Sequence, residues 1–341
     1  YIMGHLGNHQ DRTALTASKP AFDFHKAHEK LYAGLTSAAK VLLVNRPVMA
    51  RNDPESYGWI RALTESHIPF DEMKLAELKP ELLHRWDVVI LADLKKLTQE
   101  QAEMFDTYAE QGGTVLSTGI LPELRCLGIC EVRNSWKDRM SSVFELCDAE
   151  KTLFPRSAEA HYIAPGTTLN EVAFCEQTQT YLHLIPEHPF GPPERCYYTE
   201  VSDIPGVGVT QYGKGKGVCL PWLAGSFYFN EGVDNTLHLI QDVLHQICGL
   251  PELAPGLHPS VELVLCKKTD RFLVQLINGS GVFANSYFRP IPMQKIELHL
   301  PGMAGESVKA LNGGTGVAQS AGDALIITLD QLNEYEAIEI F

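Results

Sequence analysis

Residues 40–116 alternate short, uninterrupted apolar runs with segments of helical periodicity. An uninterrupted apolar run is typical of a strand buried on both faces, as in a parallel sheet covered by helices. We expect helices at residues 57–65 and 99–110, and strands at residues 41–44, 68–73, 88–92 and 114–116. Thr98 and Gln101 have the spacing of a capping box at the start of the second helix. This alternation predicts an α/β fold with a doubly wound, mainly parallel sheet of the flavodoxin-like type.

A proline-rich segment at residues 250–259 is the best domain boundary. Before it, residues 120–200 are an irregular elaboration of the sheet, followed by strands at 208–212 and 217–222 and a helix at 233–247. Beyond it, turn residues separate short expected strands at 261–267, 272–277, 295–300, 308–311, 324–329 and 335–341. The pattern predicts an α/β domain over residues 39–252 and a small all-β antiparallel sandwich over residues 258–341.

Residues 1–38 precede the first expected strand and contain one expected helix, over residues 21–35. In this helix Phe24, Ala27, Leu31 and Leu35 recur at helical spacing. A single helix with a polar loop cannot form a core by itself. We therefore interpret the segment as the tail of an upstream, barrel-like domain or as a linker helix.

The charge balance of the chain is acidic, with 42 Asp and Glu against 28 Lys and Arg and a net charge of −14. Such a balance argues against nucleic acid and anionic membranes as partners. No apolar run approaches the roughly 18 residues that a membrane-spanning helix needs. We expect neither a nucleic acid partner nor a membrane partner.

The eight cysteines are scattered along the chain, and several lie inside apolar stretches. This distribution favours reduced, buried thiols in a cytoplasmic protein over a disulfide scaffold. Cys126 and Cys130 have no second pair at ligand spacing, so no zinc site is expected. No motif indicates a cofactor.

Several motifs of the α/β segment are similar to those of one protein family. They are Ser56-Tyr57-Gly58-Trp59-x3-Leu63, Ile68-Pro69-Phe70-Asp71, Asp87-Val88-Val89-Ile90-Leu91 and Ala109-x-x-Gly112-Gly113-Thr114-Val115-Leu116-x-Thr118-Gly119. With them the segment resembles the class I glutamine-amidotransferase-like trimerisation domain of β-galactosidases and related glycoside hydrolases. The resemblance implies a (β/α)8 barrel before this domain, a small β domain after it, and assembly into a homo-oligomer such as a trimer. None of these motifs is a catalytic signature.

A working amidotransferase needs a cysteine at a tight turn between a strand and a helix, typically in Gly-x-Cys-x-Gly, where helix-end N–H groups stabilise the thiolate. The sequence has no such motif, and the corresponding position is Ser117-Thr118-Gly119. Loss of the nucleophile is the main interpretation. The alternative is a Ser117 or Cys126 nucleophile with a histidine partner such as His188, in the proline-rich loop 184–195.

A second group of candidate residues lies near the N-terminus. His25, His28 and Glu29 fall on one face of the expected helix, but they do not form a His-Glu-x-x-His motif, and a solvated or barrel-facing helix surface is the preferred interpretation. Three further candidates that could face a substrate of an upstream barrel lie in the preceding loop: His5, His9 and Asp11.

The sequence therefore predicts an assembly part of a glycoside-hydrolase-like protein that acts on or near carbohydrate without a complete active site. Glycoside hydrolysis usually needs two opposed carboxylates, and no spacing among the 42 acidic residues singles out such a pair. The alternative is a stand-alone hydrolase, of the carboxylesterase or amidase type, acting on a small ester or amide. A third hypothesis is carbohydrate binding by the β domain through Phe283, Tyr287 and Phe288.

Overall fold

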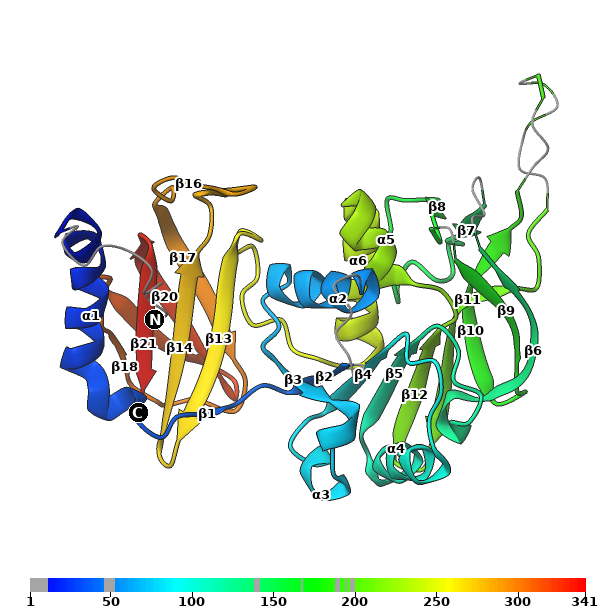
Figure 1. The fold of residues 1–341 in the computed structure, drawn as a ribbon, viewed down its shortest axis with the longest axis horizontal. Coiled ribbons are helices and arrows are strands. Elements are labelled where there is room, and N and C mark those ends of the chain that lie inside the picture. Colours follow the sequence, from blue (N-terminus) through cyan, green and yellow to red (C-terminus); the bar gives the residue numbers. More distant parts are fainter. Residues whose placement is uncertain are drawn as a thin grey trace.

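The computed structural model describes residues 12–45, 53–137, 142–166, 168–187, 191–192, 194, 196 and 200–341. Figure 1 shows an α/β domain and a β domain side by side. Two segments of the chain join them: residues 38–40, which precede the first strand of the α/β domain, and the linker that follows the last helix of that domain. The mixed α/β and β-sandwich character that the sequence predicts is present. No helix within these ranges is long and apolar enough to cross a membrane.

One nine-stranded sheet forms the centre of the α/β domain, in the order β3-β2-β4-β5-β12-β11-β10-β7-β8. Its first five members are parallel; they are β3 (Phe70–Lys74), β2 (Val41–Asn45), β4 (Val88–Ala92), β5 (Thr114–Thr118) and β12 (Gly215–Leu220). The other four are antiparallel; they are β11 (Pro205–Tyr212), β10 (Thr178–Ile185), β7 (Val143–Glu145) and β8 (Tyr162–Ile163). The expected parallel strands are confirmed, and the sheet is more mixed than predicted.

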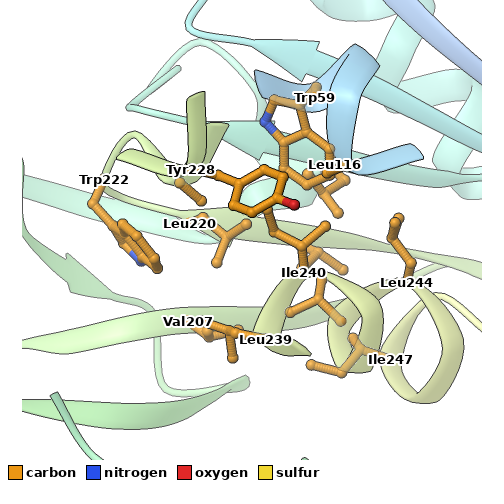
Figure 2. Packing of buried hydrophobic residues seen from close by; sticks show 14 of the residues in the cluster. Trp59, Leu116, Val207, Leu220, Trp222, Tyr228, Leu239, Ile240, Leu244 and Ile247 are labelled. Carbon is orange, nitrogen blue, oxygen red and sulfur yellow. The ribbon is translucent and has the colours of Figure 1, made fainter. Parts of the chain in front are cut away.

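Helices cover both faces of this sheet. Alternate residues of β2 enter two separate cores, Val41 and Leu43 on one face and Leu42 and Val44 on the other. The first face carries α2 (Pro54–Glu65), α5 (Ala224–Glu231) and α6 (Asp234–Asp242), which continues as a π-helical turn (Val243–Ile247). The second face carries α3 (Pro80–Leu83) and α4 (Gln99–Gln111). Figure 2 shows Trp59 of α2, Tyr228 of α5 and Ile240 of α6 packed together in the first core.

Local signals set the ends of the helices. Thr98 and Gln101 form the predicted capping box of α4, which ends at Gly112 with a φ of 125°. The side chain of Asp53 caps α2 by accepting from the backbone N–H of Ser56. These caps satisfy N–H groups that a helix cannot pair internally.

The expectation that all cysteines are reduced is wrong for two of them. Cys130 and Cys175 form a disulfide, with their Cα atoms 5.3 Å apart. They lie at the base of an antiparallel ribbon of β6 (Ile129–Trp136) and β9 (Leu169–Phe174), whose register pairs Ile129 with Phe174. The ribbon brings together two cysteines that are 45 residues apart in sequence, and scattered positions could not reveal that pairing.

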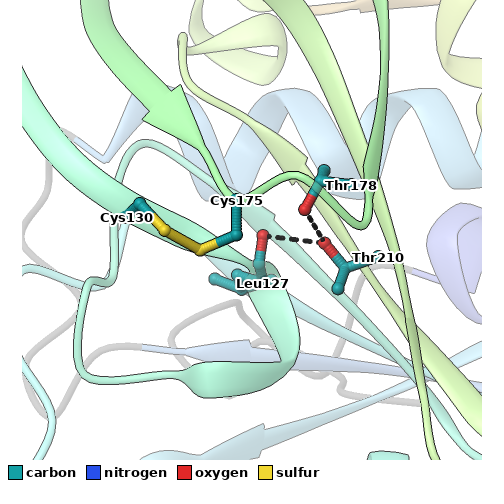
Figure 3. The surroundings of a disulfide bond; sticks show 5 residues. All are labelled: Leu127, Cys130, Cys175, Thr178 and Thr210. Atoms are coloured by element: carbon teal, nitrogen blue, oxygen red, sulfur yellow. Dashed lines mark hydrogen bonds between the residues drawn. A yellow bond between two sulfur atoms is a disulfide. The ribbon is translucent and has the colours of Figure 1, made fainter.

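The base of the ribbon is also fastened to the main sheet. The hydroxyl of Thr210 donates to the backbone oxygen of Leu127 at 3.2 Å, and it lies 2.8 Å from the hydroxyl of Thr178 (Figure 3). Gly128 follows with a φ of 64°, and a Cβ there would lie 2.3 Å from Thr178 Oγ1. Only glycine fits this left-handed, crowded position.

Two antiparallel sheets with a shared apolar core form the C-terminal β domain. The five-stranded sheet has the order β1-β13-β14-β21-β18 and consists of β1 (Thr36–Ser37), β13 (Val261–Lys268), β14 (Arg271–Asn278), β21 (Tyr335–Ile340) and β18 (Val308–Ala310). The three-stranded sheet consists of β17 (Met293–Leu300), β20 (Ala324–Leu332) and β19 (Gly316–Ala321). A separate hairpin, β15 (Val282–Phe283) and β16 (Ser286–Tyr287), extends from the upper end of this domain in Figure 1.

The N-terminal helix packs on the β domain, not on the α/β domain. This helix, α1 (Arg12–Tyr32), is longer than the predicted one. The ring of Phe24 lies 5.6 Å from that of Tyr335, and the hydroxyls of Tyr32 and Tyr335 are hydrogen-bonded. Through β1, the chain then pairs with β13 at Thr36. The described part of residues 1–38 is thus anchored on the β domain, and its role as the tail of an upstream domain stays a prediction.

Candidate functional site at the carboxyl edge of the parallel sheet

Ligands of open α/β sheets bind outside the carboxyl ends of the parallel strands. In this protein that edge is formed by the residues after β4, β5 and β12 and by the first turns of α2 and α5. An amidotransferase nucleophile would be expected at the same edge.

Glu55, in the first turn of α2, is the central polar residue of this edge and is buried. Its carboxylate accepts from the indole N–H of Trp59 at 2.9 Å and from the backbone N–H groups of Gly225 at 3.2 Å and Ser226 at 2.6 Å. Burial raises the pKa of Glu55, while these donors and the hydroxyl of Thr118 oppose the rise. A buried carboxylate with these three donors holds α5 to α2 and is not exposed to a substrate.

Close packing of the two helices reinforces this contact. A Cβ at Gly58 would lie 1.8 Å from the backbone oxygen of Gly225, so the backbones of α2 and α5 touch directly. Only glycine allows this approach. A side chain larger than hydrogen at either glycine would push the two helices apart.

Thr118 extends the polar network to the neighbouring strand. Its hydroxyl accepts from the backbone N–H of Asp93 at 3.1 Å. Asp93 has a φ of 45°, and Lys95 Nζ lies 2.5 Å from one of its carboxylate oxygens and 2.6 Å from the other. The residues that follow β4 are therefore joined to the end of β5 through Thr118.

Ser117 lies inside β5, not at a turn between a strand and a helix. It is buried between Leu91 of β4 and Cys219 of β12, and its hydroxyl donates to the backbone oxygen of Thr118 at 3.5 Å. The strand continues through Thr118, and the next helical element is a single 3₁₀ turn, η2 (Arg125–Leu127). Among the described residues no histidine is hydrogen-bonded to Ser117. The described part of the chain therefore offers this hydroxyl no histidine base.

Cys126 lies in η2 and is fully buried. Its backbone N–H donates to Asp106 Oδ1 at 2.9 Å, and burial together with the charge of Asp106 raises the pKa of the thiol far above its ordinary value. The nucleophilic form of cysteine is the thiolate. Cys126 is therefore a thiol at neutral pH and has the environment of a structural cysteine.

The other predicted site residues are not brought to this edge. His188, His5, His9 and Asp11 lie outside the described residues. His25, His28 and Glu29 lie on α1, on the β domain, whereas Ser117 and Cys126 lie in the α/β domain. The ring of His28 packs on Phe24 at 4.6 Å. In the described part of the chain, no three His, Cys, Asp or Glu side chains form a group that could hold a metal ion.

Glu55 is the site residue that sequence reasoning missed. Its local signal was an acidic residue in a first helical turn beside the Ser56-Tyr57-Gly58-Trp59 motif. Its main partners, Gly225 and Ser226, lie 170 and 171 residues further along the chain. No pattern in one sequence connects positions so far apart.

Comparison with known proteins identifies the fold. No protein-family model matches the chain, and no curated protein sequence matches it. The structure is similar to α-L-fucosidase isoenzyme 2 from Paenibacillus thiaminolyticus, with a TM-score of 0.74 and 18% identity over 98% of this chain and 53% of that one.

Two β-galactosidases are similar as well. One, from Bacillus circulans sp. alkalophilus, has a TM-score of 0.61 and 15% identity over 96% of this chain and 46% of its own. The other is the GH42 β-galactosidase Gan42B of G. stearothermophilus, with a TM-score of 0.63 and 15% identity over 98% of this chain and 45% of its own.

The chain therefore spans about half the length of the glycoside hydrolases that it matches. At these identities the likeness concerns the fold. The chain has the fold of about half of such a polypeptide.

Proposed function

We propose that this chain is the assembly part of a glycoside-hydrolase-like protein and that it lacks a complete active site of its own. The observation that carries the proposal lies at the carboxyl edge of the sheet, where buried Glu55 binds the first turn of α5 and Thr118 of β5 binds the backbone of Asp93. At the edge where an amidotransferase would carry its nucleophile, the residues of this chain hold helices and strands together instead. This favours a supporting role over catalysis.

The requirements of glycoside hydrolysis support the same proposal. That reaction generally uses two carboxyl groups placed across the sugar. In this chain the buried carboxylates of Glu55, Asp106 and Asp242 each accept from backbone N–H groups. Because the chain matches only about half of the fucosidase and the galactosidases, we place the bond-cleaving residues of the whole protein in a part that this chain does not include.

The topology favours a specific domain type. The five parallel strands lie in the order β3-β2-β4-β5-β12. If these five are numbered 1 to 5 as they follow one another in the chain, the spatial order is 2-1-3-4-5, which is the order of flavodoxin-like sheets. We infer an amidotransferase-like trimerisation domain whose nucleophile is absent. The partner in this proposal is the chain itself, in a homo-oligomer such as a trimer, and the substrate of the whole protein is a carbohydrate.

The cellular location stays a prediction. The cytoplasm was expected from reduced cysteines, whereas disulfides persist mainly in oxidising compartments. The Cys130–Cys175 bond is the feature that argues against a cytoplasmic location.

A hydrolysis panel tests the proposal against the alternative of a carboxylesterase or amidase. The wild-type chain is assayed on p-nitrophenyl esters, anilides and glycosides, and its mass is measured by light scattering. We expect no turnover above buffer and an oligomer. Turnover that Ser117→Ala or Cys126→Ala abolishes, in variants that keep the wild-type unfolding temperature, would overturn the proposal in favour of the hydrolase.

A further inference from the structure

An apolar cavity lies where the α/β domain, the β domain and the linker meet. Its volume is about 390 Å³. Of the sixteen described residues that line it, thirteen are apolar, proline or glycine, and the other three are Lys40, Lys267 and Glu306. Small-molecule sites generally have this character: a volume of about 300–1,000 Å³, mostly apolar walls, a few polar groups and a position between domains. We call this space the interdomain cavity.

Both domains contribute apolar walls to the interdomain cavity. Val41 and Ile68 come from the α/β domain, Leu253 from the linker, and Leu265 and Phe272 from the β domain. At about 30 Å³ for each water-sized group, the cavity has room for roughly a dozen such groups. The hydroxyls of a sugar would lose their hydrogen bonds to water against these walls, and that loss is unfavourable. The walls therefore favour a ligand with an apolar body over a carbohydrate.

Lys267 gives the cavity a cationic group at its wall. Side chains alternate along a strand, so Lys267 lies on the same face of β13 as Leu263 and Leu265, and both leucines belong to the core of the β domain. Lys267 also pairs with Phe272 of β14, which lines the cavity. Because Lys267 is exposed, its apolar stem follows the wall and its ammonium group reaches the mouth. In the described part of the chain, no acidic side chain forms an ion pair with Lys267.

The other two charged residues complete the mouth of the cavity. Lys40 Nζ lies 3.4 Å from Asp87 Oδ1, and both side chains of this pair are 59% exposed. Such an exposed pair is weak, so Lys40 stays available to a second anion. Glu306 is exposed and, among the residues that the structure describes, forms no ion pair with either lysine. Two cationic groups against one acidic group favour a ligand that carries a negative charge.

We propose that the interdomain cavity binds a small molecule that has an apolar chain or ring and one carboxylate group. The apolar part lies between the two domains, and the carboxylate pairs with Lys267 at the mouth. A carboxylate on a lysine ammonium accepts a charge-assisted hydrogen bond, which is stronger than one between neutral groups. A ligand that binds only the folded chain raises its unfolding temperature. The site is separate from the assembly role proposed above.

Calorimetric titration with octanoate tests the proposal. Octan-1-ol and octyltrimethylammonium have the same apolar chain with no charge and with a positive charge. We expect saturable binding of octanoate to the wild-type chain at one site, and binding of the other two that is about tenfold weaker or more. Lys267→Met keeps an unbranched apolar stem, so it should raise the Kd of octanoate about tenfold and leave that of octan-1-ol unchanged. Lys309→Met is the matched control, because Lys309 is an exposed lysine of β18 outside the cavity.

A second set of variants locates the site. Met303→Trp places a larger side chain in the cavity, which Met303 lines, and should abolish the binding of octanoate and of octan-1-ol. Leu253→Trp replaces this variant if circular dichroism or the unfolding temperature shows that it misfolds. The hairpin of β15 and β16 is another apolar surface, with Phe283 76% and Tyr287 82% exposed. Phe283→Ser with Tyr287→Ser should therefore leave the Kd of octanoate unchanged.

Each contrary outcome overturns a stated part of the proposal. Equal Kd values for octanoate and octan-1-ol in the wild type, or an unchanged Kd for octanoate in Lys267→Met, would overturn the carboxylate as the recognised group. Binding that survives the tryptophan substitution, or that is lost in the hairpin variant, would overturn the cavity as the site. The absence of saturable binding at millimolar octanoate would overturn the whole proposal. None of these results bears on the assembly role, which the molar mass of the chain tests.

Discussion

The carboxylate of Glu55 accepts a 2.6 Å hydrogen bond from the backbone N–H of Ser226, although 171 residues separate the two in sequence. The bond joins the first turns of α2 and α5 above the carboxyl edge of the sheet. It satisfies an N–H group that helix α5 cannot pair internally, because the first N–H groups of a helix have no partner within it. The favourable position of a negative charge at a helix N-terminus adds to the bond.

Removing this carboxylate should destabilise the α/β domain. In Glu55→Ala the buried donors of Trp59, Gly225 and Ser226 lose their acceptor, and we expect a loss of about 3 kcal/mol in the free energy of unfolding. Urea unfolding followed by tryptophan fluorescence measures it. Glu100→Ala is the control, because Glu100 also lies in a first helical turn but is exposed, and a change within about 0.5 kcal/mol is expected there. Equal effects of the two substitutions would contradict this account of Glu55.

The contact between Gly58 and Gly225 predicts a second loss of stability. In Gly58→Ala the new Cβ would lie 1.8 Å from the oxygen of Gly225, so α2 and α5 must separate. Overpacking of this kind costs about 1–3 kcal/mol or more. Gly316→Ala is the matched control, because a Cβ there meets only ordinary contacts at 3.6 Å and beyond. A thermal scan that shows no difference between the two variants would show that the helices adjust freely.

One buried histidine, His67, and one half-buried histidine, His245, should make stability fall in mild acid. His67 Nε2 lies 3.2 Å from the backbone oxygen of His258, and His245 Nδ1 lies 2.9 Å from that of Leu250, so both rings hold the linker between the domains. Burial lowers the pKa of each ring below its ordinary value of 6.5. Hydrogen bonds to backbone oxygens and the charge of Glu252 oppose this lowering in both rings, and the charge of Asp242 also opposes it at His245. Below pH 6.5 the unfolded chain takes up these protons more readily than the folded one, so stability present above pH 6.5 is lost as the pH falls.

The pH dependence of the unfolding temperature checks this prediction. We expect a decrease between pH 7 and pH 5 that is smaller in His67→Asn and in His245→Gln. Asparagine is chosen at position 67 because the residue there has a φ of 56°, a conformation that asparagine tolerates. His84→Gln, at an exposed position, should keep the wild-type slope. An unchanged slope in both of the first two variants would assign the acid sensitivity to other groups.

The disulfide predicts a thiol count and a loss of stability. Wild-type protein that is denatured without reductant should show six reactive thiols, since Cys130 and Cys175 are bonded. In Cys130→Ser the 45-residue loop between them is no longer closed, and the entropic treatment of such a loop gives a loss of about 4 kcal/mol as an upper limit. Cys147→Ser, at an exposed free cysteine, is the control. Eight reactive thiols in the unreduced wild type would contradict the bond.

Much of the α/β domain could be predicted because its signals are local. The apolar run of β4 marks a strand buried on both faces, and Thr98 with Gln101 marks the start of α4. Helix α5 was not predicted, because its cap, Glu55, comes from another helix. Strand β19 was missed as well, since its residues are mostly exposed and show no alternation.

The candidate site was less predictable than the fold. Ser117 was expected near a turn, but pairing of Thr118 with Ala92 and Leu220 continues the strand past it. Which cysteines pair depends on the ribbon of β6 and β9, whose register is a tertiary property. The sequence therefore pointed to single candidate residues. It could not show which residues they contact, because those contacts join positions far apart in the chain.

The molar mass of the wild-type chain in solution tests the central claim most directly. Light scattering across a concentration series should give a whole-number multiple, greater than one, of the 37.8 kDa chain mass. A mass of 37.8 kDa at every concentration would contradict the assembly role.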